Sequence, residues 1–359
     1  MNAQKPIRWA AAAAWLRGSS LHLPALHSLI FQYYDGLEGN LLATLYGHTE
    51  KVNVLIMLPD RKMASGSFDC TVRVWDASSG TCLHLLKGHG ASVRALAALN
   101  DHKLASGGYD CTVRVWDTTT GACLLALVGH HGGVNALSQC PGGELVSASF
   151  DHSLCMWDTT TGTCLRRLQG HRGAVCAVVV LSHGVLASAS EDTTVCVWDA
   201  VGDAVGHTLS GHTDAVRNLI ALPYNQLASG SCDQTVRVWD ASNGQCLHTF
   251  QHADTVEVLI SMPHGKLASA ALDGTVHWWD VASGERLMTQ KHFMAVHGMC
   301  LLPNGLLVSI SFDGNIRVWD PETGACLNTI PYFFGEGCVL VLPDGKLAAS
   351  SRSEVRVWE

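Results

Sequence analysis

Residues 47–76 read GHTEKVNVLIMLPDRKMASGSFDCTVRVWD, and related versions of this segment recur along the chain. Each version closes on a tryptophan followed by an acid. These steps are Trp75-Asp76, Trp116-Asp117, Trp157-Asp158, Trp198-Asp199, Trp239-Asp240, Trp279-Asp280, Trp319-Asp320 and Trp358-Glu359. The tryptophans lie 41, 41, 41, 41, 40, 40 and 39 positions apart. A fixed period of this length indicates one supersecondary unit repeated eight times.

One unit is predicted to contain four short strands. Residues 52–58 are mostly apolar and predict an inner strand, and a turn at 59–62 leads to a second strand at 63–67. Residues 71–75 alternate polar and apolar side chains and predict a third strand, while Ser, Ser and Gly at 78–80 predict the turn before an outer fourth strand. We therefore expect each unit to form a four-stranded antiparallel sheet.

Composition supports an all-β fold and limits the partners. The chain has 359 residues, of which 35 are Gly and only 15% are charged, as expected for many short strands joined by tight turns. The formal net charge is −8 and no run of Lys or Arg follows the chain, so nucleic acid is an unlikely partner. No stretch approaches the roughly 20 apolar residues that span a bilayer, so we expect no membrane contact.

Fourteen cysteines fall partly at repeat-related positions. Cys82, Cys123, Cys164, Cys246 and Cys326 each follow a Gly-x step, and we expect them to be small buried apolar side chains in a reducing compartment. No Cys-x-x-Cys pair is present, so we predict neither a metal site nor a cofactor. These features favour a cytoplasmic protein, with a nuclear location as the alternative.

A histidine stands 27 residues before each of the first seven tryptophans, and Gly precedes it in the first five units. With the turn Asp and the closing Trp-Asp, this pattern resembles the WD-repeat β-propeller family over residues 41–359. The resemblance implies an all-β, eight-bladed propeller preceded by a short N-terminal helical extension, residues 1–40. Two domains are therefore expected, with a division at residue 41.

The resemblance also implies a buried hydrogen-bonded latch of His, Ser, Asp and Trp in each of seven blades. The sets are His48, Ser65, Asp69 and Trp75; His89, Ser106, Asp110 and Trp116; His130, Ser147, Asp151 and Trp157; His171, Ser188, Asp192 and Trp198; His212, Ser229, Asp233 and Trp239; His252, Ser269, Asp273 and Trp279; and His292, Ser309, Asp313 and Trp319. A catalytic triad is needed once, whereas these combinations recur seven times, so we assign no catalytic residue and expect no enzyme. A hydrolase would need a non-repeating acid, for which Glu191 and Glu257 are the candidates.

The eighth repeat departs from the others. Pro331 or Tyr332 takes the His position, Ala349 replaces the Ser, and Arg352 or Ser353 replaces the turn Asp. We expect this blade to be the least stable. Residues 41–45 predict an outer strand without a blade of its own, and its pairing with the last blade would close the ring and remove an exposed edge. A seven-bladed ring with a stray eighth repeat is the alternative.

Two series of non-repeating residues are candidates for partner binding. The residue before each turn Asp is directed toward one rim in family members that hold peptides, and this rim series contains Phe68, Tyr109, Phe150, Glu191, Cys232, Leu272 and Phe312. A channel-mouth series on the inner strands contains Asn53, Arg94, Asn135, Arg217, Glu257 and His297. Clustered aromatic side chains favour a non-enzymatic protein- or peptide-binding scaffold. Alternatively, the aromatics only cover the adjacent turns and the polar residues line a solvated channel.

The first forty residues suggest two further possibilities. Residues 7–17 and 24–34 predict helices, and the second carries an apolar stripe that docks on the propeller or contacts a second protein. Residues 23–31 resemble the opening of an F-box, which would make the chain a substrate-recognition adaptor of a ubiquitin ligase. A structural assembly subunit that uses these helices and has an inert rim is the second alternative.

Overall fold

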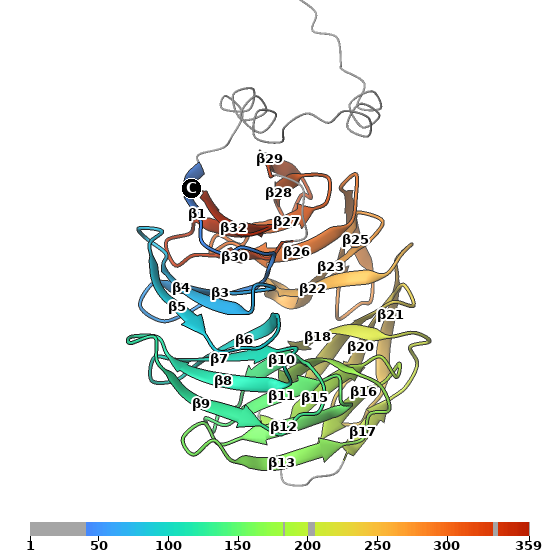
Figure 1. Cartoon of the computed structure of the whole chain (residues 1–359). Coiled ribbons are helices and arrows are strands. Elements are labelled where there is room, and N and C mark those ends of the chain that lie inside the picture. Colours follow the sequence, from blue (N-terminus) through green and yellow to red (C-terminus); the bar gives the residue numbers. More distant parts are fainter. Residues whose placement is uncertain (1–40, 182–183, 200–204, 333–336, 359) are drawn as a thin grey trace, which may run out of the picture. The chain divides into compact units, whose positions relative to one another are not determined.

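The computed structural model describes residues 41–181, 184–199, 205–332 and 337–358. These residues form an all-β propeller of eight four-stranded antiparallel sheets, the blades (Figure 1). The prediction of eight WD-type blades is confirmed, and a seven-bladed ring with a stray eighth repeat is excluded. The helices expected at residues 7–17 and 24–34, and the F-box-like residues 23–31, lie outside the described residues.

Each blade begins with an inner strand and a second strand. The inner strands are β2 Val52–Met57, β6 Val93–Leu99, β10 Val134–Gln139, β14 Val175–Val180, β18 Val216–Leu222, β22 Val256–Met262, β26 Val296–Leu301 and β30 Val339–Val341. The second strands are β3 Lys62–Ser67, β7 Lys103–Gly108, β11 Leu145–Ser149, β15 Leu186–Ser190, β19 Gln226–Ser231, β23 Lys266–Ala271, β27 Leu307–Ser311 and β31 Leu347–Ser351. A three-residue 3₁₀ turn, η2 Pro263–Gly265, joins β22 to β23.

A third and an outer strand complete each blade. The third strands are β4 Thr71–Asp76, β8 Thr112–Asp117, β12 Ser153–Trp157, β16 Val195–Trp198, β20 Thr235–Asp240, β24 Thr275–Asp280, β28 Asn315–Trp319 and β32 Glu354–Trp358. The outer strands are β5 Cys82–Lys87, β9 Cys123–Val128, β13 Cys164–Gln169, β17 Val205–Leu209, β21 Cys246–Gln251, β25 Arg286–Lys291, β29 Cys326–Pro331 and, for the eighth blade, β1 Leu41–Leu45.

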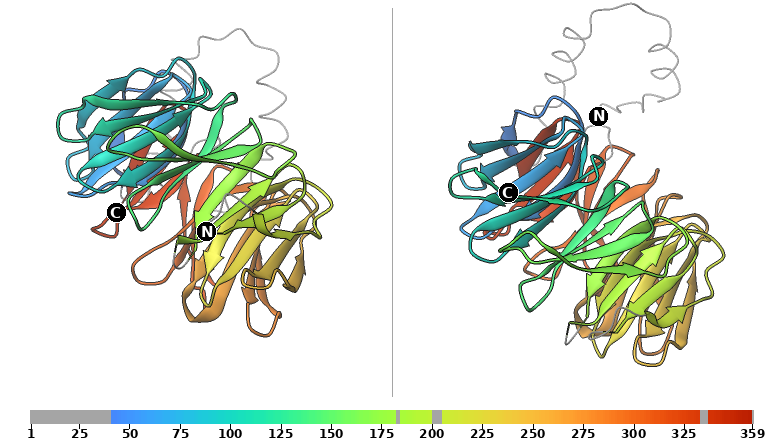
Figure 2. Two further views of the ribbon diagram at one scale, coloured as in Figure 1. Left: turned by 90° about the horizontal axis from the view of Figure 1, so that it is seen from below. Right: turned by 60° about the horizontal axis from the view of Figure 1, so that its bottom comes forward.

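The inner strands contact one another in chain order, and β30 of the last blade contacts β2 of the first. The views in Figure 2 show the blades as separate twisted sheets that follow one another along the chain. The ends of the described chain meet in the eighth blade, where β1 pairs antiparallel with β32, so that Leu41 faces Trp358 and Leu45 faces Val355. No edge of the eighth blade's third strand is therefore left unpaired.

The core lies between blades rather than within them. Small residues on the second strands allow neighbouring sheets to approach closely, as at Gly66, where an added Cβ would lie 2.8 Å from the Cγ1 atom of Val93 in the next blade. The cluster between the first and eighth blades contains Val52 and Trp75 from the first blade and Leu45, Leu342 and Val357 from the eighth. Burial of these apolar side chains is the main force that joins the blades.

The expectation that the repeat-related cysteines are buried is wrong. Cys82, Cys123, Cys164 and Cys326 are exposed and Cys246 is half-buried. All five begin outer strands, which form the outer edge of each blade, and no further strand covers that edge. The prediction that these cysteines share one position in the repeat is correct, but that position faces solvent.

The eighth blade retains the tryptophan but not the polar partners found in the other blades. The backbone N–H of Tyr332 donates to the carbonyl of Gly314 at 2.6 Å, and the N–H of His292 makes the same bond to Gly274 at 2.8 Å. Tyr332 therefore occupies the histidine position, and its buried ring meets the Trp358 ring edge-on at 6.0 Å. Ala349 is buried in place of the serine. Aromatic packing takes the place of a hydrogen-bonded chain in this blade.

Candidate functional site

The histidine, serine, aspartate and tryptophan of the first blade form a continuous buried chain. The Oγ of Ser65 lies 2.7 Å from Nε2 of His48 and accepts the indole N–H of Trp75 at 2.8 Å. Nδ1 of His48 lies 2.8 Å from Oδ2 of Asp69. Burial lowers the pKa of His48, although the neighbouring carboxylate of Asp69 opposes this shift. The imidazole is therefore neutral near pH 7 and both of its nitrogens are engaged.

The serine-centred part of this geometry recurs in all six following blades, and the histidine-to-aspartate contact recurs in five of them. The serine hydroxyl accepts the tryptophan N–H at 2.7–2.8 Å and lies 2.6–2.8 Å from the histidine Nε2 in all of them. The histidine-to-aspartate contact is 2.9 Å in blades two, three and four, 2.8 Å in blade five and 3.2 Å in blade seven. These side chains are largely buried and bonded to one another, so they stabilise each blade internally rather than form a reactive site.

Blade six departs from this arrangement. Nδ1 of His252 lies 3.3 Å from the Oγ1 atom of Thr275 and, among the described residues, makes no hydrogen bond to Asp273. His277 occupies the third-strand position that holds Arg73 in the first blade, and its ring centre lies 4.3 Å from that of His252. Burial, followed by the charge of its neighbour, lowers the pKa of His252 to about 3, and burial lowers that of His277 to about 4. This second histidine was not singled out from the sequence.

Three rim residues, Phe68, Tyr109 and Phe150, form a surface that we define as the aromatic arc. They come from three consecutive blades, and the Tyr109 and Phe150 rings are 5.6 Å apart. Phe68 is 40% and Tyr109 37% exposed, whereas Phe150 is half-buried. Surface aromatics of this kind combine a large apolar area with few rotatable bonds, which suits them to partner contacts.

The other rim residues are separate from the arc. Phe312 comes from blade seven, so blade eight lies between it and Phe68, and its ring lies tilted against that of His297 in the same blade, with ring centres 4.6 Å apart. Glu191 and Leu272 are exposed, and Cys232 is half-buried. The rim series is therefore divided: aromatic in blades one to three and seven, and mixed in blades four to six.

The channel-mouth residues fall into two groups. Asn53 and Asn135 each donate a side-chain amide hydrogen to a backbone carbonyl of the next blade, that of Val93 at 2.9 Å and that of Val175 at 3.0 Å respectively. Asn218, which the sequence series missed, makes the same kind of contact to Val256 at 3.3 Å. These asparagines clamp neighbouring blades, so their amide N–H groups are already engaged.

The remaining mouth residues carry charge or an aromatic ring. Arg94 and Arg217 are exposed, and Glu257 is half-buried. The guanidinium of Arg94 lies 5.1 Å above the Tyr109 ring. Burial raises the pKa of Glu257, while the neighbouring Arg217 opposes that shift. Mouth cations and rim aromatics are thus in direct contact.

Lys51 was not among the residues predicted to line the channel mouth, because it lies one position before the inner strand β2. Its Nζ lies 5.9 Å from the Phe68 ring centre, so two adjacent blades each place a cation on a rim aromatic. A comparison of the residues at the start of each inner strand with the rim residue of the same blade would have revealed this repeated pairing in the sequence.

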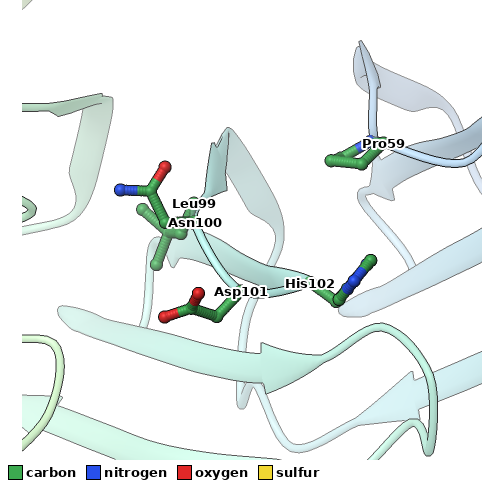
Figure 3. A pocket seen from close by; sticks show the side chains of 5 residues that line it. All are labelled: Pro59, Leu99, Asn100, Asp101 and His102. Carbon is green, nitrogen blue, oxygen red and sulfur yellow. The ribbon is translucent and has the colours of Figure 1, made fainter.

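A surface hollow of about 670 Å³ lies where the inner strands end, on the face opposite the channel-mouth residues. It is lined by Pro59, Leu99, Asn100, Asp101 and His102 (Figure 3). Nδ1 of His102 pairs with Oδ2 of Asp60 at 2.9 Å, and both side chains are more than half exposed. In Figure 3 the side chains of Asn100 and Asp101 point away from Pro59 instead of converging with it. The hollow therefore lacks the convergent polar groups that characterise a ligand site.

The described part of the chain offers neither a metal-binding cluster nor a candidate membrane-spanning helix. Among residues 41–181, 184–199, 205–332 and 337–358, no group of three or more His, Cys, Asp and Glu side chains is arranged to hold a metal ion. Within the same ranges, no helix has the length and apolar character that a bilayer-spanning segment requires.

Comparison with known proteins gives two kinds of match. The family described as "WD domain, G-beta repeat" matches residues 39–76, 80–117, 121–158, 162–199, 204–240, 244–280 and 284–320. Among solved structures, the computationally designed Ika8 protein is 32% identical, with a TM-score of 0.79 over 89% of this chain and 99% of that one. The WD40 β-propeller domain of Doa1 is 26% identical, with a TM-score of 0.64 over 89% of this chain and 96% of that one. No curated protein sequence matched.

Proposed function

The chain belongs to the WD domain, G-beta repeat family, and we propose that it is a non-enzymatic scaffold that holds a protein or peptide on its aromatic arc. Propellers of this family are generally protein-interaction scaffolds, while the place of binding differs with the side chains that each one presents. The arc, Phe68, Tyr109 and Phe150, is the surface of this chain that we assign to that role.

The observation that carries the proposal is the contact of rim aromatics with mouth cations in adjacent blades. Lys51 lies over Phe68 and Arg94 over Tyr109, and the latter ring also meets Phe150. Aromatic and arginine side chains dominate the binding energy of many protein interfaces. Together these five side chains supply both an apolar anchor surface and charged groups that select a partner.

The latch residues are not part of the proposed binding surface. Their imidazoles, hydroxyls and carboxylates are paired inside the blades, so no nucleophile is available to a substrate there. The family is typically non-catalytic, which agrees with this arrangement. We assign the reactive-looking Ser, His and Asp to stability alone.

We also propose a location in the cytoplasm or nucleus. All fourteen cysteines are free thiols, several of them at the surface, and exposed free thiols persist in a reducing compartment. Imaging of a fluorescent fusion of the full chain would test this location. Retention in the secretory pathway would contradict it.

The test of the binding function is affinity purification with a triple variant of the full chain, Phe68→Ala, Tyr109→Ala and Phe150→Ala. A matched control changes Leu83, Leu124 and Leu165 to Ala, because these residues lie on the outer strands of the same three blades and are 40%, 45% and 49% exposed. We expect the arc variant to lose partners that the control retains, with equal melting temperatures for both. Unchanged recovery by a folded arc variant would move the binding surface elsewhere.

The same experiment separates the alternatives that involve the first forty residues. Removal of residues 1–38, the segment outside the propeller unit, would abolish recovery if the chain acts as an assembly subunit with an inert rim. Loss of a Skp-type adaptor in particular would identify an F-box function. We expect the truncated chain to retain the partners that depend on the arc.

A further inference from the structure

The charges around the channel mouth are divided between two sides. Lys51 and Arg94 occupy adjacent blades, one and two, and each lies over a ring of the aromatic arc. Burial lowers the pKa of the Lys51 ammonium, the nearby Cys338 sulfur opposes this shift, and the positive charge of Arg94 adds to it. The two cations therefore repel each other across the boundary between these blades.

Acids gather on blades four to six. Glu191, Asp214 and Glu257 belong to the rim and the inner-strand entrances of these blades, and Asp254 adds its charge beside Glu257. Arg217 lies among them, since Glu257 and Glu191 both raise its pKa. Because blades one and two are separated from blades five and six by half of an eight-bladed ring, the two groups face each other across the mouth.

From this division we propose that the segment held on the arc is an extended peptide of a partner protein with an acidic side chain next to an aromatic or branched apolar one. The carboxylate takes the position between Lys51 and Arg94, and the apolar side chain packs on Tyr109 and Phe150. This inference rests on the proposed function and adds the chemistry of the ligand to it.

Three physical effects favour this ligand. A carboxylate between two cations removes their mutual repulsion and gains a charge-assisted contact with each of them. The exposed rings of Phe68 and Tyr109 gain apolar contact when a side chain covers them. The acids of blades four to six would repel a second acidic stretch across the mouth, so a single acidic position is preferred to a long anionic run.

A polyanion fits this surface poorly. Glu50 precedes Lys51, and four acids stand on the same face across the mouth, while the whole chain carries a formal net charge of −8. Nucleic-acid binders instead spread cations along the whole path of the backbone. A phosphorylated peptide is the related alternative, and the experiment below separates it from a carboxylate ligand.

The probe is a phage-displayed library of random twelve-residue peptides, selected on the full chain in parallel with the arc variant described above. Two charge-reversal variants are selected in the same way. One is Lys51→Glu with Arg94→Glu, and the matched control is Arg172→Glu, an exposed cation of blade four that precedes its blade's inner strand. Enriched peptides are then synthesised with Glu, Gln or phosphoserine at the acidic position, and their dissociation constants are measured.

We expect enriched peptides to carry Asp or Glu within two positions of an aromatic or branched residue. The double charge reversal should weaken their binding at least about tenfold, as should Gln in place of the acid, whereas Arg172→Glu should change it little. Tighter binding of the phosphoserine peptide than of the Glu peptide would overturn the carboxylate assignment.

The failures of the two proposals are distinguishable. Peptides that need the arc but show no preference for an acid, or that bind the charge-reversed variant equally well, overturn this inference and leave the binding function intact. Peptides that bind the arc variant as tightly as the natural chain, or a library with no enriched sequence, overturn both. Circular dichroism of each variant confirms that the propeller is folded.

Discussion

The Oγ of Ser65 lies 2.7 Å from Nε2 of His48, and both side chains are buried within the first blade. A hydroxyl that also accepts the N–H of Trp75 joins strands β3 and β4 to the loop before β2 through a single oxygen. Buried polar groups are stable only when all of them are satisfied, so each latch acts as one unit. Loss of one member therefore leaves the others without their partners.

Removal of the shared hydroxyl should destabilise the propeller strongly. Ser65→Ala leaves the imidazole Nε2 and the Trp75 indole N–H without their partner, so we expect the free energy of unfolding to fall by about 3 kcal/mol. Ser92→Ala is the control, because its buried Oγ has no hydrogen-bond partner among the described residues and its loss should cost less than about 1 kcal/mol. Urea unfolding of both variants measures the difference; equal stabilities would contradict the role of the latch.

Stability should decline as the pH falls below about 6.5, the ordinary histidine value. His252 and His277 have folded-state pKa values of about 3 and 4, so the unfolded chain binds protons that the folded chain excludes. Their contribution is complete above pH 6.5 and is lost progressively as the pH falls toward 4, by about 2 kcal/mol for His277 at pH 5. His277→Gln should reduce the difference in unfolding free energy between pH 7 and pH 5. An unchanged difference would show that this pair does not titrate on unfolding.

The asparagine clamps should affect stability but not binding. Asn53→Ala removes the hydrogen bond to Val93 of the next blade, and we expect a loss of about 1 kcal/mol. Asn100→Ala, at an exposed turn on the opposite face, serves as the control. If Asn53→Ala abolished partner recovery while stability stayed unchanged, the side chain would be a ligand contact and not a clamp.

Removal of β1, the strand that closes the ring, should destabilise the propeller more than the loss of an ordinary strand would. Deletion of residues 1–46 removes β1 and exposes the edge of β32, whereas deletion of residues 1–38 leaves β1 in place. We expect the longer deletion to lower the melting temperature by about 10 °C or more relative to the shorter one. Equal melting temperatures would show that closure by β1 contributes little.

Thiol reactivity should follow strand position. Cys82, Cys123, Cys164 and Cys326 are exposed at the starts of outer strands and should react with iodoacetamide in the folded protein. Cys140, Cys155 and Cys196 are buried, and burial raises their pKa values to about 11, 12 and 11. Peptide mass spectrometry should find these three unmodified until the chain unfolds. Equal labelling of both groups would contradict the placement of the outer strands.

The features that repeat were predictable from the sequence, because the same physical need recurs in every blade. A buried indole and a buried imidazole each require a partner, so Ser65 and its equivalents stand at a constant distance from both. The eight tryptophans, one in each repeat, predicted the blade count. Even the loss of the latch in the eighth repeat could be seen, although only the backbone bond of Tyr332 identified which residue replaces the histidine.

The features that depend on neighbouring blades were not predictable. The partner of Asn53 is a carbonyl 40 residues away, which no pattern within a repeat reveals. The cysteines were misjudged because a regular position does not say whether a strand lies at the centre or the edge of a sheet. Likewise, the contact of Arg94 with Tyr109 depends on how the mouth and the rim meet in space.

Amide hydrogen exchange of the full chain, with and without a partner recovered by affinity purification, tests whether that partner binds on the aromatic arc. Binding on the aromatic arc predicts slower exchange in the turns that surround it, at residues 50–53, 68–71, 91–94, 109–112 and 150–153, with little change in the outer strands β5, β9 and β13. Protection confined to those outer strands or to residues 1–40, with none in the arc turns, would contradict the account.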